Sequence, residues 1–366
     1  MDSDLLLVIV VATALAFDFT NGFHDTANVV ATSISTRAMA PRIAVAYAAV
    51  LNFAGAFISL EVAATVAEDV VDSGAITSNT VIFAGLIGAI AWNLTTWYYG
   101  LPSSSSHALI GGIVGATLAA VGTEGVLGEG IAAKVLIPAV IAPIVAFVVG
   151  ALAIVCAYRI VGRMRPGPVN RGYRLGQILS GGMLALAHGT NDAQKTMGVI
   201  TLALVINGTL ATGSDPPLWV IVAAASAIAL GTYGGGWRII RTMGTRIIKM
   251  DAAQGFSAQG AGAAVILASS HFGFPLSTTQ VISGGVMGAG AGKRVSAVRW
   301  GVAGNIVGAW LLTLPAAAGA GAATYGVTRI FGTGALGPVI VSVVALALVA
   351  VAFVRRARHG APVAVG

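Results

Sequence analysis

Two short polar motifs, repeated in the two halves of the chain, hold residues whose chemistry could bind an ion. The first copy reads Asn-Gly-Phe-His-Asp-Thr-Ala-Asn over 21–28, and the second reads His-Gly-Thr-Asn-Asp-Ala-Gln-Lys over 188–195. Glycine and aspartate are identical in the two copies and stand in the same frame. A carboxylate within an apolar, membrane-spanning segment costs about 2.5–3.5 kcal/mol or more. Each aspartate therefore needs a cation, a proton or a dense set of hydrogen bonds.

The two aspartates have different neighbours, which predicts different roles. Asp25 and Asn28, together with carbonyls of a locally unwound chain, would offer the oxygen ligands that a small hard cation takes. Histidine side chains ordinarily change charge near neutral pH, so His24 could carry a coupled proton, or it could be a hydrogen-bonded packing residue. Asp192 lies one helical turn before Lys195, and a salt bridge between them would neutralise both charges. The plainer alternative is that both aspartates only cap half-helices.

A second pair of motifs could bind an anion. Gly-Leu-Pro-Ser-Ser-Ser-Ser-His over 100–107 aligns with Gly-Phe-Pro-Leu-Ser-Thr-Thr-Gln over 273–280, and both copies continue into Gly-Gly-x-x-Gly-Ala. Proline would end one helix and a hydroxyl residue would cap the next. The first turn of such a helix presents free N–H groups and the positive end of its dipole, which is a natural oxyanion site. A polar loop with serine-capped helices is the alternative. His107 and Gln280 occupy equivalent places and would donate to the ligand.

The composition indicates what kind of molecule must position these motifs. Of the 366 residues, 57% are hydrophobic and only 9% are charged, against about 25% charged in soluble domains. The mean hydropathy is +0.89. These values exclude a cytosolic enzyme, a disordered chain and a secreted disulfide scaffold, and Cys156 is the only cysteine. The net charge of +7 does not point to nucleic acid, because the basic residues form short clusters between apolar runs, as in membrane proteins.

The apolar runs predict an all-α polytopic membrane protein with an inverted-topology repeat. Two runs, 76–121 and 252–292, are about twice the roughly 20 residues that span a bilayer, and each is interrupted by a proline, Pro102 or Pro275. Basic segments are expected in the cytoplasm and acidic segments outside. The acidic segments 67–73 and 124–129 then share one face, so the run between them is a re-entrant helical hairpin. The same logic predicts a second hairpin that opens to the cytoplasm.

Each half then reads as two crossings, a hairpin and a crossing, with a first crossing broken into two half-helices. The predicted parts are a first repeat over 1–161, a basic cytoplasmic linker over 162–176, a second repeat over 177–325, and a C-terminal transmembrane helix with a basic tail over 326–366. The N-terminus would lie outside and the C-terminus in the cytoplasm. Duplicated polar breaks of this kind indicate the midplane site of a secondary transporter.

Polar residues elsewhere in the apolar runs give weaker signals. Asp18 precedes Asp25 on the first crossing and could line the approach to the site. His188 and Asn52, like two other isolated polar residues, are explained adequately by hydrogen bonds between helices.

The duplicated signatures and the Pro-Ser-Ser-Ser-Ser-His and Pro-Leu-Ser-Thr-Thr-Gln hairpins resemble those of the inorganic phosphate transporter (PiT) family, bacterial low-affinity type. The resemblance covers nearly the whole chain and implies a symporter that imports inorganic phosphate across the cell membrane by alternating access, with no cofactor. The implied phosphate-binding residues are Ser104, Ser105, Ser106, His107, Ser277, Thr278, Thr279 and Gln280. The implied cation or proton coupling residues are His24, Asp25, Asn28, Asn191, Asp192 and Lys195.

One departure from the family pattern affects the predicted coupling ion. Sodium-coupled members carry asparagine where this chain has Lys195, and an ammonium there would occupy or repel a sodium ion. The chain is also similar to bacterial members that are driven by protons and take phosphate as a neutral metal–phosphate complex. We therefore expect protons rather than sodium, a divalent metal only as cargo, and no assigned metal ligands. The oligomeric state stays open, with a homodimer as one arrangement.

Three rival functions follow from the same residues. A sulfate permease of the same fold would use the same hairpins, although sulfate has no proton to donate at neutral pH. A channel with two re-entrant loops also uses half-helix dipoles, but carboxylates at the anion site favour coupled transport. An intramembrane hydrolase built from Ser104, His107 and Asp25 would need one asymmetric triad, whereas here the hydroxyl motif occurs twice and glutamine replaces the histidine in the second copy.

Overall fold

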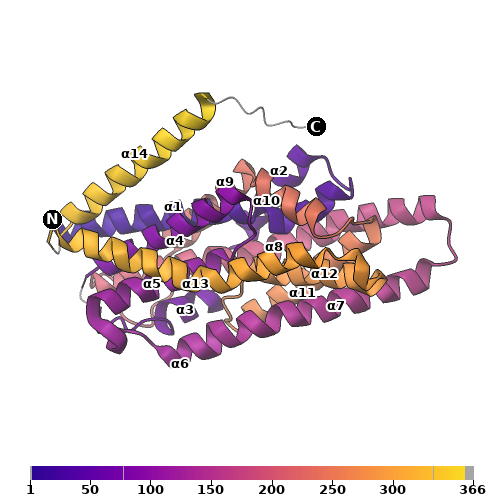
Figure 1. The fold of residues 1–366 in the computed structure, drawn as a ribbon. Coiled ribbons are helices and arrows are strands. Elements are labelled where there is room, and N and C mark those ends of the chain that lie inside the picture. Colours follow the sequence, from indigo (N-terminus) through magenta and orange to yellow (C-terminus); the bar gives the residue numbers. More distant parts are fainter. Residues whose placement is uncertain (1, 77, 333, 359–366) are drawn as a thin grey trace.

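The computed structural model describes residues 2–76, 78–332 and 334–358, and within these ranges the chain forms helices joined by loops, with an isolated β-bridge between Val71 and Val126 and no β-strand (Figure 1). The first half contains α1 (Asp2–Ser35), α2 (Pro41–Gly55), α3 (Glu61–Glu68), α4 (Thr80–Tyr99), α5 (Ser105–Val121), η1 (Gly122–Gly125), α6 (Gly128–Ile131), η2 (Ala132–Leu136) and α7 (Ile137–Val161). The second half contains α8 (Pro166–Ile206), α9 (Leu218–Gly234), α10 (Trp237–Arg241), η3 (Thr242–Arg246), α11 (Ala252–His271), α12 (Thr278–Lys293), η4 (Val295–Ala297), α13 (Trp300–Arg329) and α14 (Leu336–Arg358).

The prediction of a polytopic membrane protein agrees with the helix lengths. Five helical stretches among the described residues are long and apolar enough to cross a bilayer, and a sixth is added if α9 and the helical turns at 237–246 form one span bent by 61°. The bend falls at the Gly235–Gly236 pair, where Gly235 has a φ of +70°. The predicted C-terminal helix is present as α14, which diverges from the other helices in Figure 1. Residues 359–366 of the predicted tail lie outside the described residues.

Each predicted hairpin is present as two helices joined by a short break, while its re-entrant course in the membrane stays a prediction. The base of the first hairpin, α4–α5, is held where the acidic segments meet: the Asp72 amide donates to the Gly125 carbonyl (3.1 Å) and the Leu127 amide to the Val70 carbonyl (3.2 Å). The base of the second, α11–α12, is held where the basic segments meet, since the Arg299 amide donates to the Ile247 carbonyl (3.0 Å). Each hairpin therefore enters and leaves its group of helices at one end.

The hairpins exchange partners between the two halves of the chain. Helices α4 and α5 pack against α13, which belongs to the second half, and α11 and α12 pack against α7, which belongs to the first. Helices α1 and α8 contact each other at the centre, with α9 on α1 and α2 on α8. Every main contact thus has a counterpart in the other half, although the inverted orientation of the halves and the domain boundaries stay predictions.

The Gly-Gly-x-x-Gly-Ala stretches explain why these helices approach so closely. A Cβ atom added at Gly115 of α5 would lie 2.0 Å from the Ala318 carbonyl oxygen of α13. A Cβ added at Gly288 of α12 would lie 2.0 Å from the Phe147 carbonyl oxygen of α7. Small residues let membrane helices pack backbone against backbone. These glycines therefore hold each hairpin against the other half of the chain.

The prediction of broken first crossings is wrong. Helix α1 runs without interruption through 21–28, and α8 runs without interruption through 188–195. Unwinding would have freed backbone carbonyls in an apolar environment, where each needs a partner. Here several polar side chains of the two motifs, among them Asp25, Asn28 and Lys195, bond to the hairpin tips, and the helical ladder stays intact. The expected cation ligands from unwound carbonyls are therefore absent from these two stretches.

The predicted linker is also more ordered than expected, because only 162–165 is non-helical before α8 begins at Pro166. Proline is favoured in the first helical turn, where its missing N–H has no intrahelical partner to lose. The remaining residues of the predicted linker form the exposed start of α8. The apolar segment 43–66, which follows the first crossing, is divided between α2 and α3.

Candidate functional site

The two hairpin tips have the same backbone design. Gly100 (φ +67°) ends α4 and Gly273 (φ +71°) follows α11, a left-handed conformation that glycine adopts without strain. Ser104 then caps α5 by accepting a hydrogen bond from the His107 amide (3.1 Å). Ser277 caps α12 in the same way, with the Gln280 amide as donor (3.3 Å). The predicted serine caps are confirmed, and each tip presents the amino-terminal end of a helix.

The two tips touch each other in the interior. The Ser106 hydroxyl donates to the Leu276 carbonyl (3.0 Å), and the Gln280 amide nitrogen lies 3.4 Å from Nδ1 of His107. The amino-terminal ends of α5 and α12 thus meet in one buried place. The Ser105 hydroxyl is buried and has no hydrogen-bond partner among the described residues. A hydroxyl left free beside two helix amino termini is available to an anion.

Helix α1 brings the first aspartate motif to the second tip. The Thr279 hydroxyl donates to Oδ1 of Asp25 (3.3 Å), and the Asn28 amide donates to the hydroxyls of Thr279 (2.9 Å) and Thr278 (3.3 Å). Nδ1 of His24 lies 2.6 Å from Oδ1 of Asp25. A hydroxyl and an imidazole therefore contact one oxygen of this buried carboxylate, Oδ1.

The other side of the His24 ring faces the first tip. Its Nε2 lies 3.1 Å from the Thr96 hydroxyl and 3.4 Å from the Ser103 hydroxyl, which itself donates to Thr96 (2.8 Å). A short chain of exchangeable protons therefore runs from Asp25 through His24 to the hydroxyls beside the first tip. Sequence reasoning had not assigned Ser103 or Thr96 to the site.

Helix α8 brings the second aspartate motif between the two tips. The Lys195 ammonium lies 2.5 Å from Oδ1 of Asp192, which confirms the predicted salt bridge. The same ammonium donates to the Ser106 hydroxyl (2.6 Å) and to the Leu276 carbonyl (2.7 Å), one on each tip. Thr278 donates to the other oxygen of Asp192 (3.1 Å). Lys195 is therefore the group that ties both hairpins to α8.

Asn191 plays a different part from its neighbour. Its amide donates to the Ser270 hydroxyl (2.9 Å) and to the Phe274 carbonyl (3.2 Å), both in the second hairpin. These bonds fix the chain that leads into the tip. Asn191 therefore positions the second tip and makes no bond to Asp192 or Lys195 among the described contacts.

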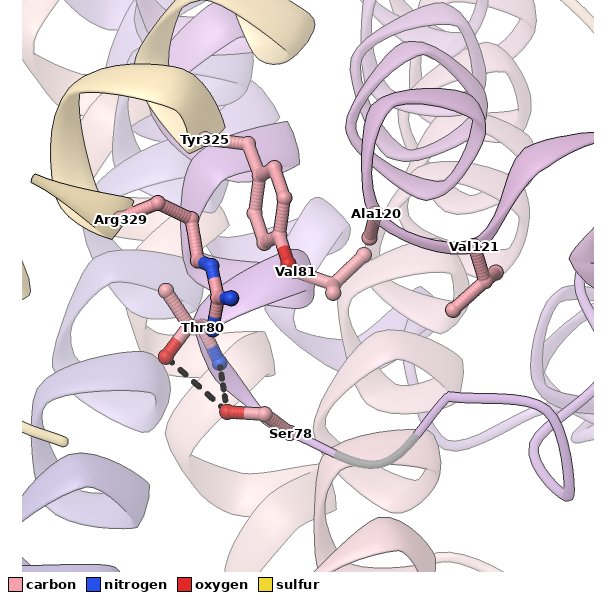
Figure 2. A pocket seen from close by; sticks show the side chains of 7 residues that line it. All are labelled: Ser78, Thr80, Val81, Ala120, Val121, Tyr325 and Arg329. Atoms are coloured by element: carbon pink, nitrogen blue, oxygen red, sulfur yellow. Dashed lines mark hydrogen bonds between the residues drawn. The ribbon is translucent and has the colours of Figure 1, made fainter. Parts of the chain in front are cut away.

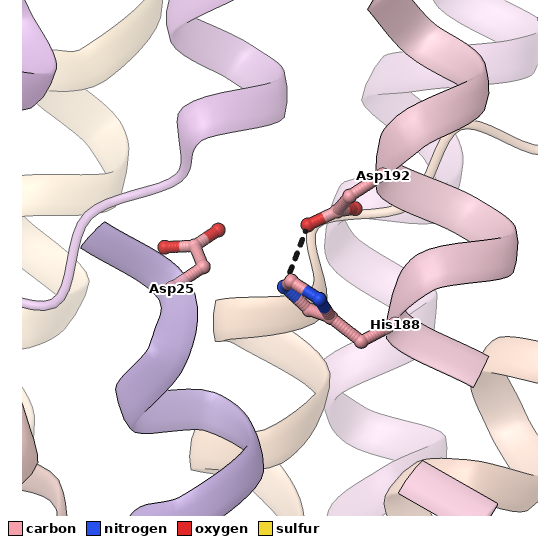
Figure 3. A group of neighbouring side chains, drawn as sticks. All are labelled: Asp25, His188 and Asp192. Carbon is pink, nitrogen blue, oxygen red and sulfur yellow. Dashed lines mark ion pairs between the residues drawn. The ribbon is translucent and has the colours of Figure 1, made fainter. Parts of the chain in front are cut away.

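His188 joins the aspartates, although the sequence pattern predicts only a packing role for it. Its Nε2 lies 3.0 Å from Oδ2 of Asp192, as Figure 3 shows, and one ligand atom each from Asp25, His188 and Asp192 lies within 4.8 Å of the others. The i, i+4 spacing of His188 and Asp192 was the available signal, since it places both side chains on one helix face. Two carboxylates and an imidazole could hold a small cation.

A divalent metal does not fit this group as it stands. Lys195 already compensates Asp192 at 2.5 Å, and the His24 ring already contacts Asp25 at 2.6 Å. A divalent ion would meet the Lys195 ammonium beside one of its carboxylate ligands. The donor set therefore favours a single added positive charge, such as a proton, near Asp25.

The structure brings all fourteen predicted site residues into this one centre, and every one of them is at most 4% exposed. They come from α1, α8 and the two tips. None of these side chains is exposed, so the centre is buried in this conformation. A transporter that alternates between two sides must pass through such a state.

Two hollows among the described residues lie away from this centre. A cavity of 430 Å³ is lined by Ser78, Thr80, Val81, Ala120, Val121, Tyr325 and Arg329, where α4 begins and α13 ends (Figure 2). A more apolar groove of 510 Å³ lies between α2 and α9. Neither hollow is lined by a predicted site residue.

The chain is similar to known phosphate transporters. A model of the phosphate transporter family matches the chain over 21–172 and 161–321. The chain is 57% identical to a probable low-affinity inorganic phosphate transporter of Mycobacterium tuberculosis, over 89% of this chain and 78% of that protein. It is 45% identical to the protein of the same description in Bacillus subtilis, over 88% of this chain and 96% of that protein. A solved structure described as the sodium-dependent phosphate transporter shares the fold, with a TM-score of 0.80 at 24% identity over 89% of this chain and 99% of that chain.

Proposed function

Since the chain belongs to the phosphate transporter family, we propose that it carries inorganic phosphate across the cell membrane and binds the ion between its two hairpin tips. It is a transporter and not an enzyme. The observation that carries the binding site is the meeting of the two tips at Lys195, whose ammonium donates to Ser106 on one tip and to Leu276 on the other. A phosphate ion that entered there would find an ammonium, hydroxyls and two helix amino termini.

In this proposal Lys195 holds the empty site closed. Phosphate oxygens are strong acceptors for an ammonium and for hydroxyl donors. They would replace the Leu276 carbonyl and the Ser106 hydroxyl as partners of Lys195, and they would take up the free Ser105 hydroxyl. Loading the site would thus loosen the direct contacts between the tips and favour the rearrangement that alternating access requires.

We further propose that a proton drives the import. Lys195 stands where the first motif has Asn28, and its ammonium already supplies Asp192 with a positive charge. Asp25 has no such tethered cation, and His24 contacts it at 2.6 Å. A proton shared by His24 and Asp25 would neutralise this carboxylate, and the hydroxyls of Thr96 and Ser103 would be its route to or from the pair.

The charge pattern supports an orientation in the membrane. The basic segments 159–174, 237–250 and 293–299 are proposed to lie in the cytoplasm, and the acidic segments 67–73 and 124–129 outside. This orientation places the N-terminus outside and the C-terminus inside the cell. Cysteine labelling from each side of the membrane, with cysteine introduced at exposed positions in 67–73 or 293–299, tests it.

Uptake of labelled phosphate into vesicles that contain the purified protein tests the function. An inward proton gradient should drive uphill accumulation without sodium. Accumulation that follows a sodium gradient at equal pH on both sides would instead make sodium the coupling ion, and a purely downhill flux would make the protein a channel. Magnesium, varied independently, tests whether phosphate crosses as a metal complex.

Two further measurements sharpen this test. Arsenate, a protonated tetrahedral analogue, should compete with phosphate, whereas sulfate should not; the opposite result would overturn phosphate as the substrate. Asp25→Asn should abolish uphill uptake while the protein still inserts into the membrane. Glu129→Gln, at an exposed position outside the site, is the matched control and should transport at the normal rate.

A further inference from the structure

Asp18 is a fully buried carboxylate that the phosphate site does not use. It lies on α1 with an exposed fraction of 0%. It precedes Asp25 by seven residues, which corresponds to about 10 Å along the helix axis. A carboxylate in this position costs several kcal/mol unless a positive charge or a set of donors accompanies it. The fold therefore has to provide Asp18 with a partner.

The Asp18 carboxylate makes no hydrogen bond of regular geometry among the described residues. The side chains of Asn21 on α1 and Thr196 on α8 are its polar neighbours. The Thr196 hydroxyl and the Asn21 side chain lie close enough to interact with the Asp18 carboxylate. Both carboxylate oxygens of Asp18, Oδ1 of Asn21 and the Thr196 hydroxyl are buried, and none of them makes a hydrogen bond of good length and angle in the part of the chain that the structure describes. Four such oxygens on two packed helices are a set of ligands for a hard cation.

The surrounding charges leave one negative charge to be balanced. On α8, Asp192 repels the Asp18 carboxylate and Lys195 attracts it. Lys195, however, is paired with Asp192 at 2.5 Å, so these two charges largely cancel as seen from Asp18. On α1 itself, the nearest ionisable side chains are His24 and Asp25, which pair with each other. Asp18 is the buried carboxylate of this region without an ion-pair partner among the described residues.

We propose that Asp18, Asn21 and Thr196 form a second cation site, separate from the Asp25 group, which takes one monovalent cation during each transport cycle. A single carboxylate balances a single charge, and neutral oxygens from an amide and a hydroxyl complete the ligand set. The bound cation is a proton on the carboxylate or a sodium ion among the four oxygens. This inference rests on the proposed transport function and adds one coupled charge to it.

The site has no copy in the other half of the chain. At the 167-residue offset of the aspartate motifs, Asp18 corresponds to Ala185 and Thr196 corresponds to Val29. The second half therefore cannot build the same set of oxygens. The site follows from the contact between α1 and α8 and not from the repeated motifs.

The test measures the charge that crosses with each phosphate. In vesicles that contain the purified protein, the reversal potential of phosphate flux gives this charge for the unaltered protein and for Asp18→Asn. The variant should move one elementary charge fewer per phosphate. Separate experiments with a pH gradient alone and with a sodium gradient alone identify the bound ion. In Asp18→Asn, only the gradient of that ion should lose its effect on phosphate flux. Asp215→Asn, at an exposed loop position, is the control.

A second pair of variants covers the case in which Asp18→Asn is inactive. Thr196→Val removes the hydroxyl at nearly constant volume. If sodium is the bound ion, the half-saturating sodium concentration should rise about tenfold or more, because a ligand is lost; if a proton is bound, the pH dependence of uptake should shift. Thr196→Ser keeps the hydroxyl and should restore the cation dependence of the unaltered protein. An unchanged charge per phosphate in Asp18→Asn, or unchanged cation dependence in Thr196→Val, would overturn the proposal. If the unaltered protein takes up no phosphate, the proposed function itself fails, which is a different result.

Discussion

Lys195 and Asp192 form an ion pair with a nitrogen–oxygen distance of 2.5 Å, and neither side chain is more than 1% exposed. The same ammonium reaches Ser106 on one hairpin and the Leu276 carbonyl on the other. This relationship joins the repeated aspartate motif to both hairpin tips, between which phosphate is proposed to bind. It makes one side chain responsible for the charge balance of the centre and for its closed shape.

Removal of the Lys195 charge should destabilise the protein strongly. Lys195→Met leaves Asp192 as a buried carboxylate without its ammonium, which should lower the free energy of unfolding by about 3–5 kcal/mol. Combining it with Asp192→Asn removes both charges and should recover most of the loss. Chemical denaturation of the detergent-purified variants measures both values. A double variant as unstable as Lys195→Met alone would contradict the ion-pair explanation.

Neighbouring serines of the first tip should separate stability from phosphate affinity. Ser104→Ala removes the cap of α5 and should reduce stability by about 0.5–2 kcal/mol. Ser105→Ala removes a hydroxyl without an internal partner, so stability should change by less than about 0.5 kcal/mol. Its loss should instead raise the half-saturating phosphate concentration about tenfold, because a hydrogen bond to a charged ligand is lost. Unfolding curves and uptake kinetics measure the two effects. A loss of stability in Ser105→Ala together with a loss of phosphate affinity in Ser104→Ala would contradict these roles.

The backbone contacts of the hairpins should not tolerate even a methyl group. Gly115→Ala and Gly288→Ala would each place a Cβ 2.0 Å from a carbonyl oxygen of the neighbouring helix, so each should destabilise the protein by about 1–3 kcal/mol. Gly308→Ala on α13 meets no atom within 4 Å and is the control. It should be neutral or stabilising by up to about 1 kcal/mol, because alanine favours a helix. Thermal unfolding midpoints check this, and equal effects at all three positions would refute the packing argument.

The base of the second hairpin should be sensitive to acid. Burial would raise the pKa of Asp251, but hydrogen bonds from Tyr158 (2.5 Å), Lys293 (2.9 Å) and the Gln254 amide (2.9 Å) outweigh it and hold the pKa below its ordinary value of 3.8. A carboxyl that is more acidic in the folded state contributes stability above pH 3.8 and loses it as the pH falls through the lowered value.

Asp251→Asn should therefore be less stable than the unaltered protein at neutral pH, and the difference should shrink below about pH 4. Unfolding midpoints measured from pH 7 to pH 3 give this comparison. A difference that stays constant over the whole range would mean that the Asp251 charge contributes nothing to the hairpin base.

Several features could be predicted from the sequence because they depend on local chemistry. The low charge content and the length of the apolar runs require a membrane protein, since such a chain has too little polar surface for water. Proline, glycine and hydroxyl residues specify a helix stop and a new helix start, so Pro102 and Pro275 marked both hairpins. The Asp192–Lys195 pair followed from its spacing of one helical turn. The motifs also contained all fourteen residues that the closed centre brings together.

Other features were decided only by tertiary contacts. Whether α1 and α8 unwind at their polar motifs depends on what surrounds them, and the hydroxyls of the tips satisfy Asp25 and Asn28 without breaking either helix. The role of His188 depends on the approach of Asp25 from another helix, and no spacing along the chain encodes that distance. The position of Asp18 along α1 predicts a residue on the approach to the site, whereas the tertiary structure places Thr196 of α8 beside it. A sequence fixes which groups share a helix face, but only the packed helices decide which buried charges find a partner and which remain open to an ion.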